Sequence, residues 1–316
     1  MTDKRKAYLA ITICSLIIGL SFLFVKQTLT IATPLDTLAH RFTMAWIVAT
    51  VILLFKKERI KIKKKDFVKI TLLSTLYPVL FFGLQIFGLM HTTSSEAGVI
   101  QATVPIFTLI LASILLKESS TGVQKISILI SVLGVMFIMY MNGAQNINPS
   151  ILGSILILLS ALANAIYNVL TKKIIQQYSL FTITYTITFI GFIVFNSIAL
   201  FIHFKNGTIQ QFILPFKQID FIIAILYLGI FSSLGSSYLS NYALSKLPAF
   251  QISIFQNLST LVTILLGIKY LNESFQYYHI IGSFLIISGV VGVNYFRKKE
   301  SQDNHFQKEK QHQTMT

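Results

Sequence analysis

Long apolar runs restrict the fold of this chain more than any other feature of its sequence. Ten of them have about the length, roughly 20 residues, that crosses the hydrocarbon core of a bilayer as a helix. They cover residues 8 to 29, 35 to 55, 67 to 88, 94 to 116, 122 to 141, 151 to 170, 179 to 203, 219 to 241, 247 to 270 and 276 to 296. Since hydrocarbon offers no partner for backbone groups, only helices and closed barrels cross it, and uninterrupted runs favour helices. The sequence therefore predicts an all-α integral membrane protein with ten transmembrane helices.

The composition agrees with a chain that is solvated mainly by lipid. Hydrophobic residues make up 54% of it, charged residues 12%, and the mean hydropathy is +0.70, which does not describe a soluble domain. A formal net charge of +15 would suit a nucleic-acid partner. However, the Lys and Arg residues lie in short clusters between the apolar runs, so no continuous basic groove results. We expect membrane lipids, and no nucleic acid, among its partners.

The basic residues also predict the orientation of the chain. If both termini are cytoplasmic, the cytoplasmic segments hold 21 Lys and Arg residues, and the opposite side holds Lys205, Lys217 and Lys269. Cytoplasmic loops are enriched in these residues. We therefore expect a multi-pass protein of the cell membrane with both termini in the cytoplasm. The first run is long and has a weak cleavage site, which favours a retained span over a secretory signal.

One short polar phrase occurs twice, as LKES at 116 to 119 and as LNES at 271 to 274. The offset of 155 residues aligns further uncommon residues, namely Gln101 with Gln256, Glu118 with Glu273, Gly134 with Gly289 and Tyr140 with Tyr295. A weaker match at an offset of 146 residues pairs Lys26 with Lys172. These matches predict two repeats of five helices each.

The repeats are expected at residues 1–145 and 146–300, with a disordered cytoplasmic tail at 301–316. Because each repeat has an odd number of spans, the second must begin on the opposite side of the membrane, so the two repeats would be inverted. Inverted repeats are a known basis for alternating access around a central site. The alternative is that duplication only produced a larger stable bundle.

Two segments carry a family resemblance. The phrase TTSSEAGVIQATVPIFTLILASILLKES and its counterpart YALSKLPAFQISIFQNLSTLVTILLGIKYLNES resemble the tandem EamA domains of the drug/metabolite transporter superfamily. The resemblance implies a ten-helix permease with cytoplasmic termini and a central cavity, moving small metabolites, often outward. The sequence departs from the family pattern in the second repeat, where Thr260 stands in place of a proline that would match Pro105. Lys117 and Asn272 replace the frequent leucine or glycine before the glutamates.

Uncharged polar residues inside the spans are the candidates for a substrate cavity. In the first repeat they are Ser21, Tyr77, Gln85 and Gln101, and in the second Asn164, Tyr167, Asn168, Tyr238, Asn241, Tyr242, Gln256 and Asn257. An amide in lipid loses hydrogen bonds, whereas a wet cavity supplies them. Bonding between helices is an equally good explanation for any one of them. As a group they favour a polar or zwitterionic solute with aromatic side chains nearby.

Three charged residues near the predicted extracellular side are candidates for gating or coupling: Glu96, Lys26 and Arg41. Ionisable groups in spans are costly and usually face a cavity or one another. The alternative is an interfacial ion pair of Glu96 with Lys26 or Arg41, or extension of these side chains to the headgroups. Glu118 and Glu273 each precede a helix and are expected to complement its N-terminus, with gating or proton coupling as the alternative.

The predicted function is that of a secondary transporter for a small polar metabolite. The substrate could be an amino acid or a related compound, and the transport could be export. The sequence leaves both points open. No zinc-protease, nucleophile-elbow or phosphate-loop motif is present, so we expect no catalytic residues, no cofactor and no metal site. A membrane adaptor or sensor is the alternative, and an intramembrane enzyme a weaker one. Assembly into a homodimer is left open.

Overall fold

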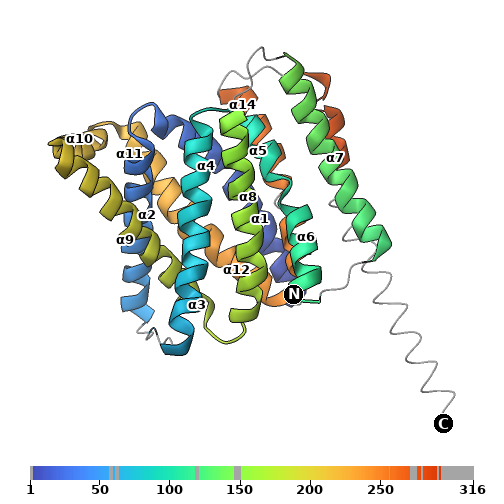
Figure 1. Ribbon diagram of the computed structural model, residues 1–316, viewed down its shortest axis with the longest axis horizontal. Helices are drawn as coiled ribbons and strands as arrows, with labels where there is room; N and C mark the ends of the chain where they lie inside the picture. The colour runs from blue at the N-terminus through green and yellow to red at the C-terminus, as the bar shows by residue number, and fades with distance from the viewer. Residues whose placement is uncertain are drawn as a thin grey trace, which may run out of the picture.

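The computed structural model describes residues 3–56, 60, 64–117, 121–145, 151–255, 257–270, 276–278, 280–289 and 292. Every regular element in this part of the chain is a helix, so the all-helical prediction is confirmed (Figure 1). The first half holds α1 (Asp3–Leu29), α2 (Pro34–Lys56), α3 (Lys64–Ser74), η1 (Thr75–Leu80), α4 (Phe81–Leu89), α5 (Ser94–Gln101), α6 (Val104–Leu115) and α7 (Gly122–Gln145). The second half holds α8 (Ile151–Ile174), α9 (Leu180–Asn206), α10 (Ile209–Ile213), η2 (Leu214–Lys217), α11 (Ile219–Leu226), η3 (Tyr227–Gly235), α12 (Ser236–Lys246), α13 (Ala249–Phe255) and α14 (Asn257–Tyr270).

Seven segments of the described residues are long and apolar enough to cross a membrane. They are Asp3–Leu29, Pro34–Phe55, Val68–Leu89, Ile151–Ile174, Leu180–Asn206, Ile219–Lys246 and Ala249–Tyr270. Three shorter apolar helices, Val104–Leu115, Gly122–Gly134 and Ile280–Gly289, fall within the remaining predicted spans. Large apolar side chains point outward from these helices, with Phe55 84% and Phe201 69% exposed. Such a surface is suited to lipid rather than to water. The chain is a multi-pass membrane protein.

Local sequence explains where several helices begin and end. Ser179 caps α9 by accepting a hydrogen bond from the Thr182 backbone N–H at 3.1 Å. At the other end of α9, Gly207 adopts a left-handed conformation with φ of 64°, which closes the helix. The predicted span 94 to 116 is broken between α5 and α6, and Pro105 lies in the first turn of α6, where its missing N–H costs least.

Two long helical segments are interrupted. A kink at η1, beside Pro78, separates α3 from α4, and the π-helical turn η3 separates α11 from α12. Within η1, Tyr77 has the non-helical dihedrals φ −140° and ψ 111°, immediately before Pro78. A π-turn leaves the regular backbone ladder and is frequent at functional sites. Tyr77 of η1 and Ser232 of η3 line a cavity in the interior of the bundle.

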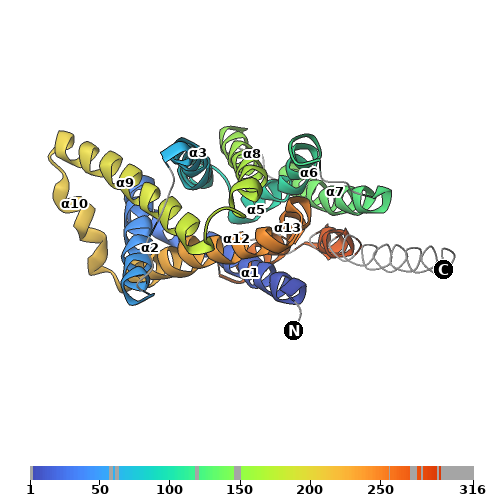
Figure 2. The same cartoon turned by 90° about the horizontal axis from the view of Figure 1, so that it is seen from below.

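The two halves of the chain interlock rather than forming separate bodies. Helix α1 packs against α12 and α14, and α8 packs against α4 and α6. Helices α2 and α9 pack together at one side of the bundle, and α6 and α7 lie at the other (Figure 2). Close approach relies on glycine, because a Cβ at Gly289 would stand 2.5 Å from the Ser127 carbonyl oxygen. The interior surface between the halves is therefore built from both.

Candidate functional site

A small central cavity of about 30 Å³ lies between α1, η1, α4, α8, η3 and α12. Seven of the predicted polar residues line it: Ser21, Tyr77, Gln85, Asn164, Tyr167, Asn168 and Asn241. Gln101 lines a smaller adjoining pocket that shares Gln85 and Asn164 with the cavity. The structure thus brings together side chains that are up to 220 positions apart, from Ser21 to Asn241. Their role toward a solute stays a prediction.

The remaining polar candidates are not placed among the cavity-lining residues. Tyr238 is 39% exposed, because it lies on the outer face of α12, and Tyr242 packs at the edge of the apolar core. Asn257 donates from Nδ2 to Ser131 Oγ at 2.5 Å and so joins α14 to α7. The structural alternative, bonding between helices, applies to this amide. Gln256 lies outside the described residues.

Two stacked tyrosines form one wall of the cavity. The rings of Tyr77 and Tyr167 have centroids 4.7 Å apart with an interplanar angle of 27°. The Tyr77 hydroxyl lies 3.2 Å from Ser237 Oγ, and the Tyr167 hydroxyl donates to Asn241 Oδ1 at 3.1 Å. These bonds tie η1 and α8 to α12, so the wall is held from three elements. The amide nitrogen of Asn168, which is 1% exposed, has no hydrogen-bond partner among the described residues.

Sequence reasoning missed the serines that also line the cavity. Ser232, Ser236 and Ser240 recur every four residues and therefore share one face of the helix, and Ser237 lines the cavity beside them. Each serine alone reads as an ordinary packing residue. The signal that could have found them is their density, since five serines occur between residues 232 and 240.

Arg41 is buried beside these serines, and its gating or coupling role stays a prediction. Its side chain is 2% exposed. Its Nε donates to Ser233 Oγ at 2.6 Å and its Nη2 to Ser232 Oγ at 2.9 Å. The guanidinium carbon lies 4.0 Å above the centre of the Phe82 ring. The alternative of an ion pair between Arg41 and Glu96 is not found among the described residues, because α2 packs on η3, where Gly229 admits the Arg41 backbone.

Glu96 and Lys26 both form hydrogen bonds with Thr92. The Thr92 hydroxyl donates to Glu96 Oε2 at 2.5 Å, and the Ser154 hydroxyl donates to Glu96 Oε1 at 3.0 Å. Lys26 donates from Nζ to the carbonyl oxygens of Leu89 and Thr92, each at 2.6 Å. This arrangement joins α1, the α4–α5 turn and the start of α8. A gating role for these residues stays a prediction.

Lys172, at the end of α8, makes the corresponding contacts at the other end of the bundle. Its Nζ donates to the carbonyl oxygens of Leu244, at 2.5 Å, and Leu247. The neighbouring Lys246 pairs with Asp3, at the start of α1, at 3.1 Å. Since Lys26 lies near the other end of α1, the two lysine contacts stand at opposite ends of the bundle.

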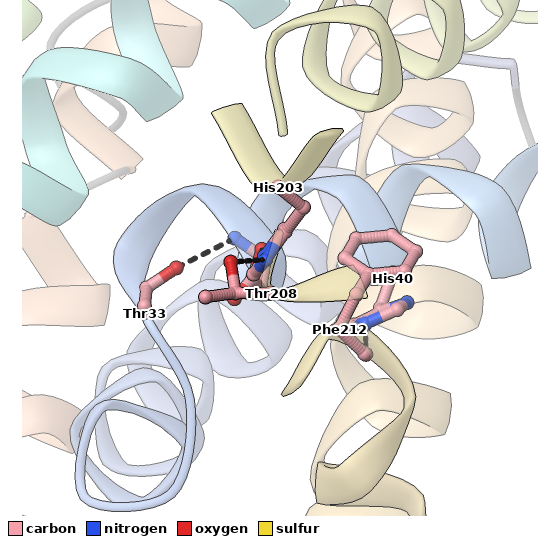
Figure 3. Close-up of polar contacts among 6 residues, drawn as sticks. Thr33, His40, His203, Thr208 and Phe212 are labelled. Carbon is pink, nitrogen blue, oxygen red and sulfur yellow. Dashed lines mark hydrogen bonds and ion pairs between the residues drawn. The ribbon is translucent and has the colours of Figure 1, made fainter. Parts of the chain in front are cut away.

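A second polar cluster lies where α2 begins and α9 ends (Figure 3). His203 Nε2 stands 2.9 Å from Asp36 Oδ1, and both side chains are buried. His203 Nδ1 lies 2.8 Å from Thr208 Oγ1, and His40 Nε2 lies 2.8 Å from the Phe212 carbonyl oxygen. The sequence signal that could have found this cluster is the position of Asp36 and His203, each at the end of a predicted span on the same side of the membrane. The described residues hold no group of three His, Cys, Asp or Glu side chains suited to a metal ion.

Several predicted features fall outside the described residues. They are Glu118, Ser119, Asn272, Glu273, Ser274, Tyr295 and the tail 301–316. The proposed capping by the two repeated glutamates is therefore untested.

Comparison with known proteins extends over almost the whole chain. The family model described as "EamA-like transporter family" matches residues 5–140 and again residues 151–295. The protein named "Uncharacterized transporter YcxC" of Bacillus subtilis (strain 168) is 49% identical over 299 residues, which cover 95% of this chain and 96% of that protein. "Uncharacterized transporter YetK" of the same strain is 26% identical, over 93% of this chain and 88% of that protein.

A similar fold occurs among solved structures. One crystal structure superposes with a TM-score of 0.69 and covers 93% of this chain and 97% of that chain. Its sequence identity is 13%, so the likeness concerns the fold alone.

Proposed function

The chain belongs to the EamA-like transporter family, and from this premise we propose that it is a secondary transporter for a small polar metabolite. The solute would bind in the central cavity, which opens alternately to the two sides of the membrane. The family and the names of its relatives point to a transporter rather than an enzyme. The observation that carries the proposal is the cavity itself, in which hydroxyl and amide groups from both halves gather inside an apolar bundle.

The proposal includes ten spans arranged as two inverted five-helix repeats, 1–145 and 146–300. Three observations support it. The family model matches twice, once in each half. The kink at η1 and the π-turn η3 each interrupt the third predicted span of their repeat. The packing is reciprocal, since α1 contacts α12 and α14 while α8 contacts α4 and α6. Rocking of two such repeats about a midplane site is the usual mechanism of alternating access.

The proposal places the protein in the cell membrane with both termini in the cytoplasm. The asymmetry of Lys and Arg residues supports this orientation. The direction of net flux follows from the solute and ion gradients, and both uptake and export are compatible with the fold.

Flux through purified protein in liposomes tests the proposal. Labelled amino acids and small organic acids would be screened for movement faster than in protein-free liposomes. Ser237→Phe, which fills the cavity, should abolish the flux that the unmodified protein supports. Tyr238→Phe is the matched control, because it alters the neighbouring exposed side chain and should leave flux unchanged. If no solute of the panel crosses, or if Ser237→Phe transports normally, the result contradicts the proposal and favours an adaptor or sensor.

A further inference from the structure

The charged groups around the cavity are a second feature, separate from its polar lining. Its described lining residues are hydroxyl, amide, thiol, aromatic and aliphatic, and none of them is Asp, Glu, Lys, Arg or His. Arg41 contacts two of them, Ser232 by a hydrogen bond and Phe82 through its ring. The formal charge that acts on this wall is therefore positive.

Arg41 has no anionic partner in the part of the chain that the structure describes. The ion pairs found there join Lys69 to Asp66, His203 to Asp36 and Lys246 to Asp3. A buried cation is costly unless an anion compensates it, and ionisable groups inside membrane bundles usually serve function. The serine hydroxyls stabilise the guanidinium but do not neutralise it. An anion from outside the protein would do so.

Two hydrogen-bond donors at the cavity also lack acceptors among the described residues. Ser232 Oγ accepts a bond from Arg41, so its own hydroxyl hydrogen is available to an acceptor in the cavity. Asn168 Nδ2 is buried without a partner, although Asn168 lines the cavity. A carboxylate supplies what both need, since it accepts several hydrogen bonds and carries the opposite charge to Arg41.

We propose that the solute is a monocarboxylate that accepts hydrogen bonds from Ser232 and Asn168, while Arg41, behind Ser232, supplies the opposite charge. The body of the solute would lie against the stacked rings of Tyr77 and Tyr167, which suits a planar or aromatic group. Solutes with a net positive charge would be disfavoured, because the described lining offers them no acid. This inference rests on the proposed transport role and narrows it to one chemical class.

Binding to the purified full-length protein in detergent tests the inference. The probes are benzoate, phenylacetate and indole-3-acetate, each compared with its neutral amide and with phenethylamine as a cation. Thermal unfolding and titration calorimetry are the measurements. We expect at least one carboxylate to bind and to raise the unfolding temperature. Its amide should bind at least about tenfold more weakly, which corresponds to about 1.4 kcal/mol of binding free energy. Absence of binding by all three carboxylates, or equal binding by the amides, would overturn the inference.

Variants assign the selectivity to Arg41. Arg41→Gln should reduce the preference for the carboxylate over its amide to near unity, and Arg41→Lys should retain part of it, since the charge remains but the planar fork is lost. Arg5→Gln is the matched control, because Arg5 is exposed near the start of α1. An unaltered preference in Arg41→Gln contradicts the assignment. The unfolding temperature and elution volume of each variant show whether it is folded.

The same probes separate this inference from the transport proposal. If carboxylates bind selectively but do not cross liposomes that contain the protein, the inference stands and the transport role fails. If neutral or cationic solutes cross and the carboxylates neither bind nor compete, transport stands and the inference fails.

Discussion

Lys26 and Lys172 each donate hydrogen bonds to two main-chain carbonyl groups, and the two sets of carbonyls are separated by one constant offset. Lys26 binds Leu89 and Thr92, and Lys172 binds Leu244 and Leu247, which lie 155 positions further along the chain. Each lysine ends a long helix and binds the turn at the end of another. These residues recur at the offsets by which the sequence repeats.

Replacing either lysine by methionine should destabilise its own end of the bundle. Lys26→Met and Lys172→Met keep most of the side-chain length but remove charge-assisted bonds, which are each worth about 1.5 to 3 kcal/mol. Because the sites are at opposite ends, the losses in unfolding free energy should add in the double variant. Thermal unfolding in detergent measures this, with the exposed Lys205→Met as control. A strongly non-additive double variant would contradict independent ends.

The single cysteine of the chain reports on access to the cavity. Cys14 is fully buried, lines the cavity and forms no disulfide. Labelling by N-ethylmaleimide should therefore be slow in the unmodified protein and faster in Lys26→Met or Lys172→Met, since loosening one end admits the reagent. Mass spectrometry follows the reaction, and Cys14→Ser should not be labelled. Equal rates in all cysteine-containing variants would show that the lysines do not restrict access.

Adding one methyl group at Gly229 should displace Arg41. A Cβ there would stand 2.8 Å from both the Arg41 carbonyl oxygen and Met44 Cβ, so Gly229→Ala should cost about 1 to 3 kcal/mol of stability through overpacking. It should also weaken binding of phenylacetate. Gly83→Ala is the control, since no atom lies within 4 Å of that position, and it should be neutral or stabilising. A stable Gly229→Ala protein would mean that α2 and η3 separate easily.

Breaking the buried Asp36–His203 pair should destabilise the junction of α2 and α9. Asp36→Asn replaces the carboxylate that His203 contacts at 2.9 Å with a neutral amide, with an expected loss of about 1 to 3 kcal/mol. Asp220→Asn, at an exposed position at the start of α11, should have little effect. Thermal unfolding of both variants gives the comparison, and equal stabilities would show that the pair contributes nothing.

A reporter fused after residue 316 should lie in the cytoplasm. A fluorescent-protein fusion should then be fluorescent and an alkaline phosphatase fusion inactive, because the first reporter matures inside the cell and the second outside it. Fusion after Lys217 of the long connection before α11 should give the opposite result. Active phosphatase at the C-terminus would overturn the proposed orientation.

The sequence predicts features that depend on the bilayer, such as span positions, better than features that depend on packing, such as side-chain partners. The positions of seven spans could be predicted because hydrocarbon thickness sets helix length and leaves runs such as 179 to 203, where α9 is found, unmistakable. Cavity residues such as Asn164 and Asn168 could be predicted because amides are costly in lipid. The partners of Arg41 could not, since they depend on how the π-turn η3 rotates Ser232 and Ser233 toward α2. Tyr238 was misplaced for the same reason, because a helix has an outer face that composition does not reveal.

The interlocked packing has a consequence for how the protein is made. Helix α1 ends at Leu29, yet its partners α12 and α14 begin at Ser236 and Asn257 and leave the ribosome far later. During synthesis the first helix must therefore wait in the bilayer with its small and polar face, including Ser15 and Gly19, uncovered. Lipid or the insertion machinery has to shelter that face until translation is nearly complete.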